Sequence, residues 1–121
     1  ARHRDLPKDD CRFSCMDHPD GLLLKTRESE DFLVLNGTQT QSARVYNLVD
    51  EVADMAEIGV DVVRVSPQAN HTQDVIALFD EARRRAISPQ AALARSQSLM
   101  PAAGCNGYWH GRPGLEQGVV A

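Results

Sequence analysis

Two cysteines near the start of the chain are the residues whose type and spacing best suit chemistry. Cys11 and Cys15 lie four positions apart in a polar segment, so two thiolates from one short loop can reach one metal centre. A third cysteine, Cys105, lies near the other end, in a stretch rich in glycine and aromatic residues. Three cysteines complete neither a four-thiolate cluster nor an even set of disulfides. The spacing therefore indicates a metal-binding protein of which this chain supplies only some ligands.

The residues alone leave other interpretations of the cysteine pair open. The simplest is two ordinary thiols in a surface loop. A zinc site is a second, since His3 and His18 are near enough in sequence to complete a set of two cysteines and two histidines. The spacing matches no standard zinc finger, however, which makes zinc the weaker metal alternative.

The third cysteine belongs to the run Cys105-Asn-Gly-Tyr-Trp-His-Gly-Arg-Pro-Gly114. We expect Cys105 to serve packing rather than chemistry. Tyr108 and Trp109, flanked by glycines, are expected to cover the end of a barrel or the metal site. His110 is a candidate acid or base, although no carboxylate partner is evident near it in sequence.

Composition and charge restrict the class of protein. The chain has 121 residues, 42% of them hydrophobic and 25% charged, as expected for one globular domain with a modest core. Its formal charge of −4 argues against a dedicated nucleic-acid-binding domain, since phosphate binding draws on clustered Lys and Arg. No apolar run approaches the ~20 residues of a membrane span. The odd cysteine count favours a reducing compartment, and hence the cytoplasm.

The first half of the chain predicts strands and one long helix around these residues. Residues 1–20 are expected to form a cysteine-bearing loop of the cluster site. Short strands are expected at 21–26 and 31–35, and a further strand rich in β-branched residues at 60–65. Between them, apolar residues at three- and four-residue intervals predict a helix that starts at 38–42 and ends near 57. Strand, helix and strand in this order predict a right-handed βαβ unit with parallel strands.

The second half predicts two more helices and an irregular end. The helices are expected at 72–85, closed by three arginines, and at 88–95, where Ser88-Pro89 makes a typical start. Residues 96–121 hold five of the eight glycines and look irregular. Alternation of the two element types over 21–95 predicts an α/β protein, the C-terminal units of a (β/α) TIM-like barrel.

The chain also reads as a truncated piece. It begins without methionine in a charged run, so we expect sequence to be missing upstream. Parallel strands without neighbours lose much of their apolar cover. We therefore expect residues 1–121 alone to fold poorly or to associate through exposed strand edges.

Polar residues at the ends of the predicted strands are candidates for substrate binding. In a (β/α) barrel, function lies at the carboxyl ends of the strands. The six candidates follow or belong to two of these strands: Asn36, Thr38, Gln39, Arg64, Ser66 and Gln68. Turn formation and helix capping are the alternative explanation for most of them. Arg64 differs, because a guanidinium inside a barrel must be paired, and an anionic donor or substrate would pair it.

Several motifs occur together and in order along nearly the whole chain. They are Pro7-Lys-Asp-Asp-Cys11-x-x-x-Cys15, Phe32-Leu-Val-Leu-Asn-Gly-Thr-Gln-Thr40, Val45-Tyr-Asn-Leu48, Asp61-Val-Val-Arg-Val-Ser-Pro-Gln68 and Cys105-Asn-Gly-Tyr-Trp109. This series resembles the C-terminal part of the UbiV family, the ubiquinone-biosynthesis branch of the collagenase-like peptidase superfamily. The resemblance covers roughly residues 1–115, and linked motifs in register are far more specific than any one of them.

The resemblance implies a (β/α) barrel protein with a 4Fe-4S cluster held by four cysteines. Cys11 and Cys15 match two of the ligands, the other two would lie upstream, and Cys105 is not a ligand in this pattern. It further implies an oxygen-independent hydroxylation system, acting on an aromatic ubiquinone precursor with a UbiU-like paralogue as heterodimer partner and a lipid-binding accessory protein. No peptidase activity is implied. A related enzyme that hydroxylates RNA bases, and a non-catalytic scaffold carrying the cluster, remain alternatives.

Overall fold

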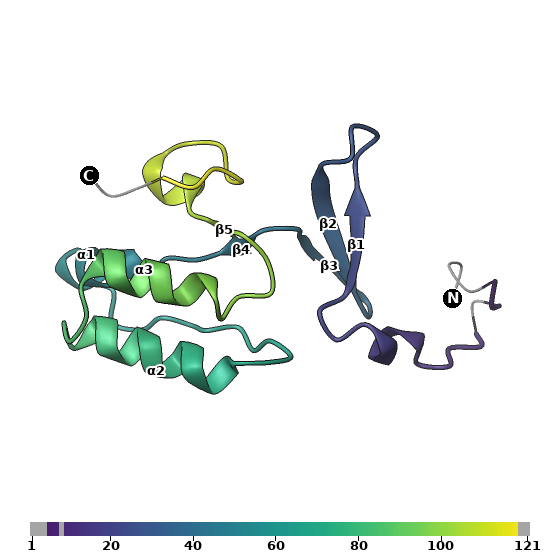
Figure 1. Ribbon diagram of the computed structural model, residues 1–121, viewed down its shortest axis with the longest axis horizontal. Helices are drawn as coiled ribbons and strands as arrows, with labels where there is room; N and C mark the ends of the chain where they lie inside the picture. Colours follow the sequence, from purple (N-terminus) through teal and green to yellow (C-terminus); the bar gives the residue numbers. More distant parts are fainter. Residues whose placement is uncertain (1–4, 8, 119–121) are drawn as a thin grey trace. The chain divides into compact units, whose positions relative to one another are not determined.

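The chain is a mixed α/β protein built from short elements in two compact units. The computed structural model describes residues 5–7 and 9–118. One unit comprises Ala1–Ala43 and contains a sheet, and the other comprises Arg44–Ala121 and contains the α-helices. Figure 1 shows the elements of both units along the chain. The described residues form no closed barrel.

The first unit contains an antiparallel sheet of three strands, in the order β1–β2–β3. They are β1 (Leu22–Lys25), β2 (Asp31–Asn36) and β3 (Gln39–Ser42). Both expected strands therefore form, but they pair antiparallel with one another. The turn between them is closed by an ion pair of 2.7 Å between Lys25 and Asp31. A polar turn of five residues is too short for a crossover, so it returns the chain as a hairpin.

The expected start of the long helix is wrong, because a third strand forms there. A helix was expected to start at a cap within residues 38–42, but Gln39–Ser42 instead pairs with β2, with Asn36 opposite Gln39. Gly37 takes a φ of 59° in the turn, a conformation that an Asn-Gly pair adopts readily. The strand is exposed along its whole length, which explains why polar residues suffice there. Here tertiary pairing outweighs the capping pattern.

The second unit is built around two helices, α2 (Thr72–Arg83) and α3 (Pro89–Gln97), which lie side by side in Figure 1. Both were expected from the sequence. The only part of the long helix to form is the 3-10 turn η3 (Val49–Glu51) with α1 (Val52–Glu57). A small core joins them, centred on three buried side chains: Val49, Leu78 and Ala92.

The second half of the expected βαβ unit, the strand at residues 60–65, is wrong. The structure assigns no strand to these residues, and β2, the other strand of that unit, pairs antiparallel with β1 and β3. Val62 is 83% exposed, and no strand in the described part of the chain lies beside it. A β-rich sequence forms a strand only where a partner edge is available, because strand propensity reflects packing with neighbours.

The C-terminal segment returns to the helices through a minimal parallel pair. Strand β4 (Val45–Tyr46) pairs with β5 (Gly104–Cys105), and the 3-10 helix η4 (Gly107–His110) follows. Helix α3 extends through the first two residues of the segment 96–118, and outside these elements the segment is irregular, as expected. Among the helices described, none has the length and apolar character needed to cross a lipid bilayer.

Candidate functional site

The cysteine pair lies in a tight loop that exposes both thiols. Cys15 belongs to the 3-10 helix η2 (Ser14–Asp17), and Phe13 enters it with a φ of 51°. The loop is a chain of turns in which the N–H of His18 donates to the oxygen of Cys15 at 3.1 Å. Cys11 and Cys15 are free and exposed, so both sulfurs are accessible to a metal. Two thiols from one turn-rich loop suit adjacent corners of a cluster.

The described residues supply no further ligands around this pair. They bring together no group of three or more His, Cys, Asp or Glu side chains able to hold a metal ion. Of the two histidines considered for zinc, His18 is half-buried beside the loop, and His3 lies outside the described residues. Cys105 is buried, with 4% exposure, and burial raises the pKa of its thiol. Within the described residues, Cys11 and Cys15 are thus two exposed thiols without a third metal-ligating side chain grouped with them.

The first three substrate-site candidates lie together in the β2–β3 hairpin. Asn36 ends β2, Thr38 is in the turn, and Gln39 begins β3. All three are exposed. They therefore form or flank the turn of this hairpin.

The other three candidates lie in the extended segment before α2. Arg64 and Ser66 are exposed, and Gln68 is half-buried. The Gln68 side chain donates to the oxygen of Leu99 at 2.5 Å, while its backbone N–H donates to the hydroxyl of Thr72 at 3.1 Å. Gln68 thus ties the start of α2 to the segment after α3.

A buried acid cluster in the second unit is the most unusual feature of the structure. Glu51 ends η3 with a side chain only 1% exposed, yet it carries a carboxylate. The Nε2 atom of His110 lies 2.9 Å from its Oε1, and the Trp109 side chain hydrogen-bonds the same carboxylate. The residue before it, Asp50, is 6% exposed. The C-terminal aromatic motif thus covers two adjacent buried acids.

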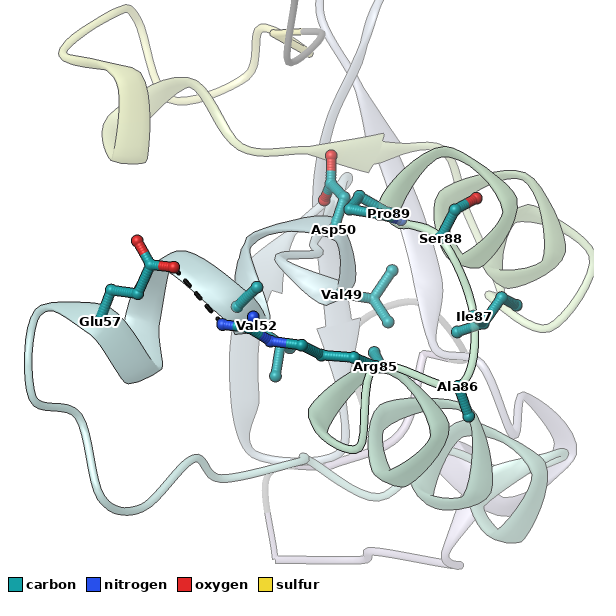
Figure 2. A pocket seen from close by; sticks show the side chains of 11 residues that line it. Val49, Asp50, Val52, Glu57, Arg85, Ala86, Ile87, Ser88 and Pro89 are labelled. Carbon is teal, nitrogen blue, oxygen red and sulfur yellow. Dashed lines mark hydrogen bonds and ion pairs between the residues drawn. The ribbon is translucent and has the colours of Figure 1, made fainter.

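Burial governs the protonation of these acids. Desolvation raises the pKa of Glu51, and the charge of Asp50 raises it further, against the opposing effect of His110. Desolvation also raises the pKa of Asp50. In Figure 2 the carboxyl group of Asp50 points away from Arg85 and Glu57. Within the described residues, neither Asp50 Oδ1 nor Glu51 Oε1 has a hydrogen-bond partner, although His110 Nε2 lies within ion-pair distance of the latter.

Asn106 holds the end of the described chain beside this cluster through hydrogen bonds. Its side chain accepts a hydrogen bond from the N–H of Gly118 at 2.6 Å and donates to the oxygen of Gly118 at 3.0 Å. The backbone N–H of Asn106 donates to Glu116 at 3.0 Å. The Nδ2 atom of Asn106, which carries two N–H groups, also lies 3.3 Å from Nε2 of His110. The Glu51 carboxyl group and the Asn106 amide therefore both lie beside the same nitrogen of the His110 ring.

The sequence offered His110 as a candidate acid or base, but it did not indicate Glu51, the carboxyl group beside it. Glu51 lies 59 positions earlier in the chain, where it reads as one more polar residue of a helix. No sequence signal marks it, because Asp50 and Glu51 fall between the apolar positions of the predicted helix, as solvent-facing residues do. Pairing over such a distance is decided by tertiary structure alone.

Comparison with known proteins adds no assignment to this geometry. No family model matches the chain, and no solved structure matches it significantly. Fold and site together define a mixed α/β chain with two accessible thiols in one unit and a buried carboxyl group 2.9 Å from an imidazole nitrogen in the other.

Proposed function

We propose that this chain belongs to the iron–sulfur subunit of an oxygen-independent hydroxylation system in ubiquinone biosynthesis, and that it corresponds to the C-terminal part of a UbiV-like protein. The observation that carries the proposal is the series of motifs in register, from the Cys11-x-x-x-Cys15 pair to Cys105-Asn-Gly-Tyr-Trp109. The accessibility of both thiols supports it.

In this proposal Cys11 and Cys15 bind two irons of a 4Fe-4S cluster, and two upstream cysteines complete the set. The cluster, when bound, supplies one-electron chemistry or holds the assembly together. The aromatic ubiquinone precursor is the substrate, and the partners are a UbiU-like paralogue and a lipid-binding accessory protein. The protein acts in the cytoplasm, and peptidase activity is not part of its function.

The TIM-like barrel belongs to the same proposal. The exposed apolar side chains of Phe32 and Val62 support it, since such side chains are covered on both faces in a complete parallel sheet. In a complete barrel, residues 60–65 would have a partner strand. Arg64, Ser66 and Gln68 would then follow that strand at the functional end of the barrel.

The proposal is tested on the intact protein purified without oxygen. Iron and acid-labile sulfide are measured together with the visible absorption of the cluster. We expect Cys11→Ala and Cys15→Ala each to lose most of the cluster. Cys105→Ala is the matched control and is expected to retain it, because its thiol is buried in the other unit. Full cluster content in Cys11→Ala and Cys15→Ala would contradict the ligand assignment.

Deletion of the gene separates the activities. Loss of anaerobic ubiquinone supports the proposal, whereas loss of a hydroxylated nucleoside with normal quinone would favour an RNA-modifying enzyme. An assembly that remains active after removal of the cluster, and whose cluster never changes redox state, would favour a scaffold. Each result discriminates one class of function from the others.

A further inference from the structure

The second unit contains a pocket that the proposed function does not use. It has a volume of about 460 Å³, within the size range of small-molecule sites. Its lining comes from η3, α1, the end of α2 and the start of α3. Most of the lining is aliphatic: Val49, Val52, Ala53, Ala82, Ala86, Ile87 and Pro89. An aliphatic pocket of this size suits an apolar ligand body.

One cationic side chain crosses this pocket. Figure 2 shows Arg85 extending from the end of α2 past Val52 toward Glu57. Its NH2 atom lies 3.4 Å from Oε1 of Glu57, and both side chains are more than two-thirds exposed, at 69% and 68%. An exposed pair at this distance contributes little to stability. The guanidinium is therefore available to an anion that enters the pocket.

The neighbouring arginines show that Arg85 is a special case. Arg83 and Arg84 both pair with Asp80, at 2.6 and 2.8 Å, as cations at a helix end commonly do. Arg85 is turned away from them, with a φ of 55°. Among the residues that line this pocket, it carries the only guanidinium, beside the two carboxyl groups of Asp50 and Glu57.

The backbone at Arg85 favours a different residue. Its N–H donates to the oxygen of Ala82 at 3.0 Å, and the N–H of Ala86 donates to Glu81 at 2.9 Å. These two bonds form a Schellman motif, whose left-handed residue is usually glycine. An arginine there is strained, and strain of this kind is often retained at ligand sites.

We propose that this pocket binds a small monocarboxylate with an apolar body. The aliphatic walls take the body, and Arg85 exchanges the Glu57 carboxylate for that of the ligand. The hydroxyl of Ser88 accepts a hydrogen bond from the N–H of Ala91 at 3.2 Å and keeps its own proton to donate. This site stands independently of the cluster and of the proposed hydroxylation.

The test compares benzoate with benzamide, which has the same shape without the charge. Binding to the full chain is followed by saturation-transfer NMR, which detects small ligands on monomers and assemblies alike. We expect benzoate to bind about tenfold more tightly than benzamide, since a charge-assisted bond is lost with the amide. Equal binding of the two probes, or no binding of either, would overturn the proposal.

Variants of Arg84 and Arg85 test whether Arg85 is the residue that binds the carboxylate of benzoate. Arg85→Gln and Arg85→Gly are expected to reduce benzoate affinity about tenfold, while Arg84→Gln stays within about twofold of the parent. Arg85→Gly is also expected to unfold at a higher denaturant concentration, because glycine relieves the strain. Glu57→Gln is expected to bind benzoate more tightly, since the competing carboxylate is gone.

Circular dichroism on the same samples checks that α2 and α3 are helical in each variant. A sample without their helical signal would overturn the pocket on which the proposal stands. Equal losses in Arg84→Gln and Arg85→Gln would equally overturn it, because they would indicate general attraction to positive charge.

Discussion

Asp50 and Glu51 are the residues at which this chain departs most from ordinary burial. Two adjacent carboxyl groups are almost fully enclosed, with one imidazole, that of His110, to balance them. Buried charge is costly unless it is paired, so the pair destabilises the folded chain whenever both groups are ionised. Buried acids with a raised pKa are more common at functional sites than in ordinary cores, which makes this pair a candidate for a role beyond packing.

The first prediction concerns the charge of Asp50. Its pKa is raised by burial above the ordinary value of 3.8, so the folded state holds the proton more tightly than the unfolded state. Its contribution to stability is therefore full below the ordinary value and is lost as the pH rises through the folded value. We expect Asp50→Asn to raise the free energy of unfolding at neutral pH and to have less effect in acid.

Urea denaturation at acidic and neutral pH measures this difference between parent and variant. Asp61→Asn is the control, because Asp61 is exposed in the segment before α2. A variant that is less stable than the parent at neutral pH would show that the Asp50 carboxylate has a stabilising partner.

The second prediction concerns the core. Leu78 is fully buried in α2 and contacts the small cluster around Val49 and Ala92. Leu78→Ala is expected to cost about 2–5 kcal/mol of the free energy of unfolding, from lost transfer energy and the cavity left behind. Ile76→Ala, on the same helix but 52% exposed, is expected to stay within about 0.5 kcal/mol. Similar losses in both variants would contradict the packing of α2.

At the scale of elements, the start of α3 is where sequence and structure agree best. The Ser88 hydroxyl accepts from the N–H of Ala91 at 3.2 Å, and Pro89 occupies the first turn. Local chemistry alone decides such a helix start, because the cap and the proline need no distant partner. The hairpin differs, since β3 depends on the edge that β2 offers.

The third prediction follows from this cap. Ser88→Ala is expected to lower the free energy of unfolding by about 1 kcal/mol, because one N–H at the start of α3 loses its acceptor. Ser98→Ala, just after the end of the same helix, is the matched control and is expected to change stability by less than about 0.5 kcal/mol. Thermal and urea unfolding measure both, and an unchanged Ser88→Ala would contradict the cap.

At the scale of the whole molecule, exposed apolar surface is the dominant feature. Val62, Phe32 and Met16 are each at least half exposed, and they belong to both units. Apolar side chains on unpaired extended segments promote association with other chains. This surface is what the barrel proposal would bury.

The fourth prediction is that the isolated chain self-associates through residues 60–65. Val62→Lys is expected to shift sedimentation at a given concentration toward the monomer by placing a charge on this segment. Ile76→Lys, an exposed apolar residue on α2, is the control and is expected to have a smaller effect. A parent chain that is monomeric and unfolds cooperatively would contradict both this prediction and the barrel.

The sequence by itself determined the features whose causes are local. The hairpin strands at Leu22–Lys25 and Asp31–Asn36, helix α2 and the capped start of α3 follow from apolar spacing and turn chemistry within a few residues. The same holds for the cysteine pair, whose four-residue spacing places both thiols in one loop. The resemblance to the UbiV family also rests on sequence alone.

Tertiary structure alone decided the rest. Residues 60–65 have strand propensity without a partner, so they stay extended and unpaired, while Gln39–Ser42 gain a partner and become a strand. Glu51 meets His110 only because β4 pairs with β5 and brings the C-terminal motif onto η3. Contacts between residues far apart in sequence depend on which surfaces are left to bury, and no local pattern encodes that choice.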